Sequence, residues 1–395
     1  MRLSEPAIQV SLLHPEEEIR VTAAAFFSGS YSRCETVMPQ VIQAVERYGR
    51  NNAFRMLRSA ERLQQTAGTV DWLIDELRRG YALDERDEDN YRYAIALVLY
   101  RAGPDLLQPR CGEIMALPMF PEPLRRPFEE RLEWLQWDWD RGCVALEAMG
   151  RGALRKGRLT ASDARRTACI VESLARHGAT QAATVLDLLQ RSYDPGSEAW
   201  LQWCRPWLMS LAGAMRLDAT ISMAVMHLCD DDLHVADEST TALIKIGNDA
   251  VVRAIAAHWS SADGNFRAAA SDVLEHIHTD LCAETGLQFF IAEEDRETKQ
   301  FLAHAVLTQF LAEGVEPLRQ LVLAHGAEVP PNDLDIRRRL VAACTVMGVS
   351  FPEFESWYGE AVADKWGLGN YQPHRLADGF WADPPEPKRL GNGKS

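Results

Sequence analysis

The densest group of side chains that could bind a metal lies between residues 227 and 238. This group consists of His227, Asp230, Asp231, Asp232, His234, Asp237 and Glu238. Imidazole and carboxylate groups are common ligands of zinc and calcium. A calcium-binding EF-hand loop is excluded, because DDDLHVADEST lacks the glycine that such a loop needs at its sixth position. Whether these residues bind a metal or only shape the backbone depends on the elements that carry them.

A motif that recurs every 31 to 33 residues predicts those elements. In its first clear copy the apolar positions have the spacing i, i+7, i+8 and i+11, which places them on one helix face. The three copies are Val235, Ala242, Leu243, Ile246; then Phe266, Val273, Leu274, Ile277; then Lys299, Val306, Leu307, Phe310. A second helix follows each of them, the first with Val252, Ile255, Ala256 and Trp259 on one face. A fixed period of this length is typical of stacked repeats that share a continuous core.

The repeat offers a structural explanation for the acidic group. Asp230 to Asp232 fall at the predicted turn before a helix, where carboxylates cap the N-terminus and favour its dipole. The same place holds Asp263 in the next copy and Glu294-Asp295 in the third. His276 and His278 alternate at the end of a helix, so they point to different faces and form a poor chelate. We therefore expect no metal site, no catalytic residue and no cofactor.

The composition is that of an ordinary soluble protein, and the net charge limits the kinds of partner that it can bind. The 395 residues are 47% hydrophobic and 25% charged, with a net charge of −15. An acidic balance argues against a nucleic-acid binder, which needs a basic stripe. The N-terminus lacks the pattern of a secretory signal, and no apolar run is long enough to span a membrane. The eight cysteines are scattered singly without a CxxC pair, which favours a reducing cytoplasm.

The pattern divides the chain into four parts. Residues 1–110 hold further helix pairs, with Ile19, Phe26 and Phe27, and later Tyr91, Val98 and Leu99, in the repeat columns. Residues 111–215 fit the repeat poorly. Residues 216–345 hold the clear repeats, and 346–395 are predicted to form a capping helix and a Pro- and Gly-rich tail. The prolines at 118, 121, 123 and 127 predict a loop over 115–130.

The order of residues in the repeats resembles the HEAT-like repeat of the phycobilisome-lyase type. That order is an acidic turn, Val or Phe, Ala, Leu, Ile-Gly, Asp, Val and Leu, best seen over 216–325 and also over 10–108. The arginine usual after the first Val is present as Arg20, Arg92 and Arg267, whereas Ala236 stands there in the first clear copy. The resemblance implies an α-solenoid superhelix of stacked antiparallel helix pairs. The family includes scaffolds, lyases, hydroxylases and glycosylases, so the fold does not decide the function.

This chain lacks features of two kinds of enzyme in the family, which reduces the number of possible functions. The metal-dependent hydroxylases resemble one another in paired His-Glu steps, and this chain has no His-Glu dipeptide. The glycosylases have a basic groove, against which the acidic balance argues. Two tryptophan clusters mark the irregular segment, Trp134, Trp137, Trp139 and Trp200, Trp203, Trp207. The second has the spacing of one helix face and predicts a buried stripe; the alternative is an exposed aromatic patch that anchors a partner. One of Trp137 and Trp139 is expected to be partly exposed.

Two hypotheses about function follow. The first is a cytoplasmic, non-enzymatic scaffold that binds a protein partner, without contact to nucleic acid or membrane. Its surface is expected on the second helix of each pair, which usually lines the concave face. The predicted partner-binding residues are Arg253, Glu284, Gln288, Glu316, Arg319, Trp137 and Trp139. The alternative is a lyase-type enzyme of the repeat family, which would need a pocket in the 110–215 region lined by Trp and converging polar groups.

Overall fold

The regular structure of this chain is helical. The computed structural model describes residues 2–51, 53–79, 85–158, 160–324, 331–364 and 366. Across these ranges the only pairing of strand type is an isolated antiparallel bridge between Arg2 and Leu311. The all-α prediction is confirmed, and none of the described helices is long and apolar enough to cross a membrane. The predicted Pro- and Gly-rich tail lies, beyond residue 366, outside the described residues.

The helices fall into three successive groups. The first comprises α1 (Glu5–Val10), α2 (Glu17–Gly29), α3 (Val37–Tyr48), α4 (Ala53–Ser59), α5 (Ala67–Arg78), α6 (Glu85–Arg101) and α7 (Pro104–Leu107). The second comprises α8 (Cys111–Met115), α9 (Glu122–Trp134), α10 (Trp139–Lys156), α11 (Ala161–Ala175), α12 (Ala182–Ser192), α13 (Ala199–Trp203) and α14 (Arg205–Ala214). The third comprises α15 (Ile221–Met226), α16 (Leu233–Ile246), α17 (Asp249–Trp259), α18 (Gly264–His276), α19 (Asp280–Ala292), α20 (Arg296–Thr308), α21 (Val315–Ala324), α22 (Pro331–Met347) and α23 (Phe354–Ala363).

The clear repeats form the helix pairs that the period predicts. Each helix from α16 to α20 starts at a side chain that accepts a backbone N–H of the first turn, from Asp232, Asn248, Asp263, Thr279 and Asp295 in order. Such caps satisfy donors that have no partner within the helix. Helix α16 ends at Gly247, whose φ of 62° is left-handed and suits glycine. The apolar columns are buried, except that Phe266 and Lys299 are half-buried.

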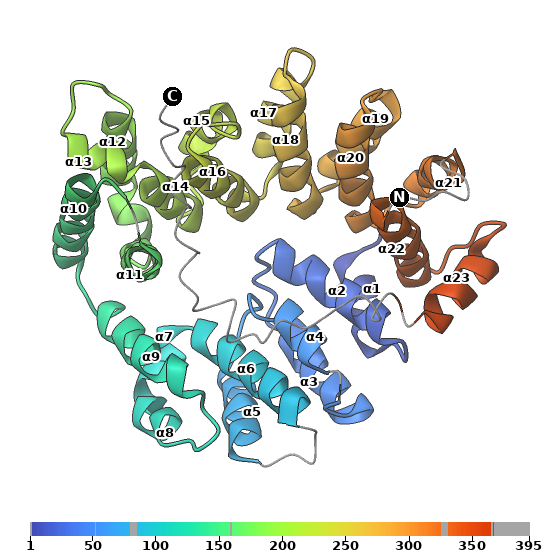
Figure 1. Ribbon diagram of the computed structural model, residues 1–395, viewed down its shortest axis with the longest axis horizontal. Helices are drawn as coiled ribbons and strands as arrows, with labels where there is room; N and C mark the ends of the chain where they lie inside the picture. Colours follow the sequence, from blue (N-terminus) through green and yellow to red (C-terminus); the bar gives the residue numbers. More distant parts are fainter. Residues whose placement is uncertain are drawn as a thin grey trace, which may run out of the picture.

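The helix pairs form two layers that follow a curve (Figure 1). The first helices of the pairs contact one another in the order α14, α16, α18, α20 and α22, and α2, α4 and α6 do the same. These helices lie on the inside of the curve, whereas α15, α17, α19 and α21 lie outside. The arrangement is consistent with an α-solenoid. The expectation that the second helices line the concave face does not hold in this molecule.

Side-chain size explains which layer is inside. A Cβ added to Gly213 on α14 would fall 2.4 Å from the Cα of Ala242 on α16, so these inner helices approach almost backbone to backbone. In the outer layer, α17 and α19 are held apart by the stacked rings of Trp259 and Phe289, with centroids 4.1 Å apart. The layer with the closer spacing must lie on the inside of a curve.

The two ends of the described chain meet. Helix α2 packs on α22, and the N-terminus lies beside α22 in Figure 1. The Leu3 N–H donates to the Phe310 carbonyl at 3.0 Å. The Phe26 ring stacks on the imidazole of His278 at a centroid distance of 3.7 Å, and His278 Nε2 lies 3.0 Å from the Phe26 carbonyl. The first helices therefore cover the last repeats, and the molecule closes into a ring.

The middle segment corrects two predictions. The predicted loop over 115–130 is wrong from residue 122 onward, where α9 begins with Pro123 in its first turn and Pro127 inside it. Burial of Leu124, Phe128 and Leu132 favours the helix despite the missing proline N–H. The second tryptophan cluster does not lie on one helix, because the helix is interrupted at Cys204, between α13 and α14. Only Trp207 of that cluster is buried, and Trp200 and Trp203 are half-buried.

Candidate binding sites

The acidic group at 227–238 shapes the turn between α15 and α16. The carboxylate of Asp232 caps α16 by accepting the His234 N–H at 3.0 Å, and Asp230 accepts the Asp232 N–H at 2.9 Å. His227 Nδ1 lies 2.8 Å from an Asp230 oxygen, and its ring stacks on Tyr193 with centroids 4.3 Å apart. These contacts account for Asp230 and Asp232 as turn and cap residues, as the repeat predicts.

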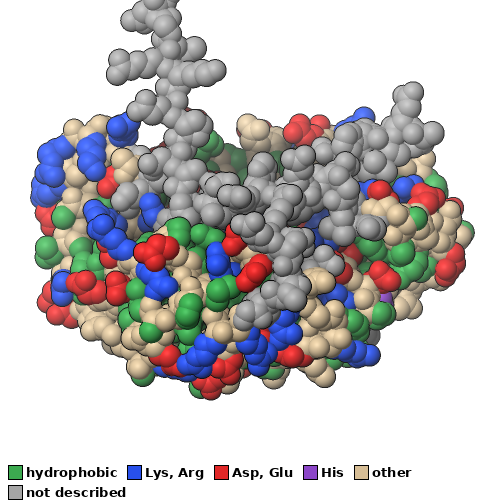
Figure 2. All heavy atoms as spheres, turned by 60° about the horizontal axis from the view of Figure 1, so that its bottom comes forward, with side chains coloured by type: hydrophobic (Ala, Val, Ile, Leu, Met, Phe, Trp, Pro, Cys, Tyr) green, Lys and Arg blue, Asp and Glu red, His purple; other side chains and the backbone are tan. Residues whose placement is uncertain are grey.

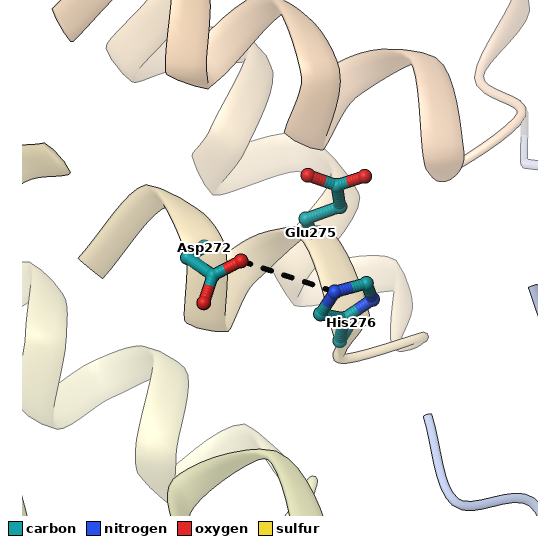
Figure 3. Close-up of side chains that lie close together, drawn as sticks. All are labelled: Asp272, Glu275 and His276. Atoms are coloured by element: carbon teal, nitrogen blue, oxygen red, sulfur yellow. Dashed lines mark ion pairs between the residues drawn. The ribbon is translucent and has the colours of Figure 1, made fainter. Parts of the chain in front are cut away.

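A different trio has metal-ligating atoms close together. Asp272, Glu275 and His276 project from the last turns of α18, with one ligand atom of each within 4.8 Å of the others (Figure 3). The nearest approach shown is 3.9 Å, between His276 Nε2 and Asp272 Oδ1. The Glu275 carboxylate already accepts from Arg339 at 2.8 Å and from Thr308 at 3.2 Å. The guanidinium neutralises the Glu275 carboxylate, so this trio is a weak candidate for a metal.

A central cavity of about 490 Å³ opens on the inner layer. Its walls come from segments far apart in the sequence: the end of α2, the turn after α4, the end of α6, and helices α14 and α16. The charged and polar side chains that line it include Tyr31, Glu61, Arg62, Gln64, Gln65, Arg101, Ser210, Glu238, Thr241 and Lys245. No single repeat contains these residues together, so the sequence pattern offered no signal for this cavity.

Tyr31 organises the cavity. It directly follows the helical turn at the end of α2 and has a φ of 50°, in the left-handed region that few residues other than glycine adopt. Its carbonyl accepts from Arg216 at 3.2 Å, which links the α2 end to the segment after α14. The Arg62 guanidinium and the Lys245 ammonium both lie over its ring, 4.9 Å and 5.2 Å from the centroid. Cation–π attraction stabilises this grouping of two like charges.

The charges of the central cavity are not all paired. Arg101 donates to Glu61 at 3.2 Å across the gap between α6 and the turn after α4. Burial raises the pKa of Glu238, and a hydrogen bond with Ser210 acts in the opposite direction. Burial also lowers the pKa of Lys245, which Glu238 partly offsets. Arg62 and Lys245 have no ion pair among the described residues, so the cavity presents unneutralised cations.

A second pocket, the middle pocket, lies between α9 and α11 and has a volume of about 390 Å³. Tyr100, Trp134 and Cys169 line it together with the charged residues Arg126, Glu130, Arg165 and Arg166. Arg126 donates to Glu130 at 2.7 Å. Burial raises the pKa of the Cys169 thiol to about 11, so the thiol stays protonated and is a poor nucleophile at neutral pH. The lining is therefore not suited to nucleophilic catalysis through Cys169.

The predicted partner-binding residues on the repeats lie in the outer layer. Arg253 on α17, Glu284 and Gln288 on α19 and Glu316 on α21 are exposed. Arg319 on α21 differs, since it donates to both oxygens of Glu353 at 2.6 and 2.7 Å. Its side chain is only 15% exposed, which favours a structural role for this residue.

Trp137 and Trp139 are both half-buried. The Trp137 ring lies beside Trp134, with centroids 5.6 Å apart, and under the Arg141 guanidinium at 4.3 Å. Its indole N–H has no hydrogen-bond partner in the described part of the chain. Trp139 meets the His177 ring edge-on at 6.1 Å. These contacts attach both indoles to the core of the middle segment.

Comparison with known proteins assigns no family. No protein-family model matches the chain. No curated protein matches it either. Among solved structures, an engineered protein of the Northeast Structural Genomics Consortium aligns over 88% of this chain and 100% of its own, at 12% identity and a TM-score of 0.32. A score that low supports no argument about fold or function, so the sites must be judged by their own geometry.

Proposed function

We propose that this protein is a non-enzymatic, HEAT-like scaffold that binds a protein partner on the outer face of α17, α19 and α21. The observation that carries the proposal is a pair of exposed apolar residues at equivalent places on successive outer helices. Ile291 on α19 is 60% exposed and Leu323 on α21 is 41% exposed. Each directly follows a buried residue of the repeat core, Phe290 and Val322. Exposed apolar side chains that recur in this way are typical of interaction surfaces.

The polar residues predicted from the sequence share this face. Glu284, Gln288 and Ile291 are spaced i, i+4 and i+7 on α19, so they lie on one side of the helix. Glu316 and Leu323 have the same seven-residue separation on α21. The result is a face with apolar side chains at the C-terminal ends of α19 and α21 and charged and amide side chains before them.

Charge and cysteine state support the same class of protein. On the face shown in Figure 2, Lys and Arg side chains alternate with Asp and Glu, without a continuous basic stripe. On this face, that distribution favours a protein partner over nucleic acid. All eight cysteines are free, including the buried Cys204, Cys282 and Cys344, which supports a place in a reducing cytoplasm.

The test is a double substitution, Ile291→Glu with Leu323→Glu. Partners that co-purify with the unchanged protein would be identified by mass spectrometry, and the affinity for each would then be measured by calorimetry. Loss of an apolar anchor at an interface costs about 2 kcal/mol or more, so we expect binding at least tenfold weaker. Val144→Glu is the matched control, because Val144 is 68% exposed on α10 and lies outside this face. Equal affinity of the double variant and the control would contradict the proposal.

A second candidate function has one observation in its favour. The lyase-type alternative requires a Trp-lined pocket with converging polar groups, and the middle pocket has Trp134 and three arginines. The raised pKa of Cys169 weighs against a covalent mechanism there. Turnover that is lost on Arg166→Gln would support the alternative over the scaffold.

A further inference from the structure

The central cavity contains a charge arrangement that the protein does not complete by itself. Most arginines that bridge helices in this molecule meet a carboxylate, as Arg50 does with Glu76 at 2.7 Å and Arg131 with Glu172 at 2.9 Å. Arg62 and Lys245 instead converge on the ring of Tyr31 without an ion pair among the described residues. Two cations held near one another repel, so an anion between them would relieve that repulsion.

The nearby carboxylates form no ion pair with these two cations. Glu61 accepts from Arg101. Glu238 acts on Lys245 without an ion pair, and its charge raises the Lys245 pKa against the effect of burial. Glu238 and Lys245 are seven residues apart on α16, which is about 10 Å along the helix axis. The separation leaves the Lys245 ammonium directed at Tyr31, and burial favours the neutral form of the Glu238 carboxyl, whose pKa it raises.

The donors and the size of the cavity define a ligand class. The Arg62 guanidinium offers a planar fork of N–H groups and Lys245 a point charge, and the hydroxyl-bearing Tyr31 and Thr241 also line the cavity. Such donors match the oxygens of a carboxylate or a phosphate. A volume of about 490 Å³ lies within the range of small-molecule sites and is too small for a folded partner or a duplex.

We propose that the central cavity binds a small metabolite through its oxyanion group, a carboxylate or a phosphate, held between Arg62 and Lys245 against Tyr31. The ligand would join the segment 31–101 to helices α14 and α16. It would therefore stabilise the closed ring in addition to filling the site. This inference is independent of the outer-face proposal, since none of its residues lies on α17, α19 or α21.

The experiment uses the full chain and two probes, inorganic phosphate and succinate, titrated by calorimetry at constant ionic strength. Lys245→Met and Arg62→Gln remove the charges, and Met keeps the apolar stem over Tyr31. Loss of one charge-assisted hydrogen bond should weaken binding about 10- to 100-fold. Lys245→Arg keeps the positive charge and should retain most of the affinity. Arg155→Gln, at an exposed arginine in the last turn of α10, is the matched control and should bind as the unchanged protein does.

The outcomes separate cleanly. Binding of phosphate alone identifies a phosphate ester as the ligand class, binding of succinate alone identifies a carboxylate, and either result supports the proposal. Thermal unfolding of each variant without ligand checks that the fold survives. Absence of binding by both probes at millimolar concentration would overturn the proposal. Equal affinity of a folded Lys245→Met variant and the unchanged protein would overturn it as well.

Discussion

The clear repeats, α16 to α21, and the middle segment, α9 to α14, are both two-layered and helical, yet they are held together in different ways. In the repeats, large apolar side chains such as Leu243 and Leu274 recur in fixed columns and are fully buried. In the middle segment, α10 approaches its neighbours through glycines. A Cβ on Gly150 would fall 2.6 Å from the Cys204 sulfur, and one on Gly142 would fall 2.7 Å from Leu174. A repeated column is visible in a sequence, whereas a single close approach is not.

The largest expected effect tests the columns of the repeats. Leu274→Ala should lower the free energy of unfolding by about 2–5 kcal/mol, because it leaves a cavity where a fully buried side chain packed. Leu243→Ala should do the same one repeat earlier. Denaturant unfolding followed by circular dichroism measures both. A loss below about 0.5 kcal/mol at both positions is incompatible with buried columns.

The next effect concerns His278, which packs on Phe26 where the N-terminal helices contact the repeats. Burial lowers the pKa of His278 to about 3, and the nearby Arg2 and His276 charges act in the same direction. In the unfolded chain this imidazole is protonated near pH 6.5, whereas in the folded chain it stays neutral down to about pH 3. The free energy of unfolding is therefore highest above pH 6.5 and decreases as the pH falls from about 6.5 to 3. The slope from this group approaches about 1.4 kcal/mol per pH unit.

His278→Gln should remove that part of the pH dependence. Unfolding free energies measured across this pH range would show it as a shallower slope. His258→Gln is the control, because His258 is exposed on α17. If the His278 variant keeps the full slope, the imidazole is not the group that resists protonation.

Replacing a glycine by alanine should have different effects on stability in the middle segment and in the repeats. Gly150→Ala should destabilise by about 1–3 kcal/mol, since the added methyl group meets the Trp200 backbone oxygen at 2.7 Å as well as Cys204. Gly286→Ala in α19 meets nothing within 4 Å. That variant should be neutral or more stable by up to about 1 kcal/mol, because alanine favours the helix. The melting temperature of each variant is measured by thermal unfolding. If both substitutions lowered it equally, close glycine contacts would not distinguish the middle segment from the repeats.

The smallest effect comes from the helix caps. Asn248 accepts the N–H groups of Ala250 and Val251 at the start of α17, so Asn248→Ala should cost about 1 kcal/mol. Gln181 stands at the same place before α12 without a side-chain cap bond. Gln181→Ala should therefore change stability by less than about 0.5 kcal/mol. Chemical denaturation of both variants, side by side, gives the comparison, and equal losses would mean that the side-chain bonds of Asn248 do not stabilise α17.

The sequence predicted the parts of this fold that depend on short-range order. The columns and the cap at Asp232 follow from periodicity and residue type. The predicted loop over 115–130 was wrong because burial of Phe128 and its neighbours overcame the proline pattern. The predicted inner surface was reversed because the spacing between layers depends on contacts such as Gly213 with Ala242, which no periodicity reveals.

The candidate sites differ in the same way: one could be predicted from local sequence order, and the other depends on tertiary contacts. Glu284 and Gln288 could be placed on a helix surface from the sequence, since neighbours three or four residues apart share a face. The central cavity could not, because Lys245 on α16 lies far along the chain from Tyr31 and Arg62 and meets them only in the folded molecule. The sequence by itself determined the helices, their caps and their period, whose contacts link residues about one repeat apart. The tertiary structure alone decided the closure, through contacts such as that of His278 with Phe26, 252 residues away. Chain connectivity places no local constraint on such a pair, so only the summed packing of the whole molecule brings it together.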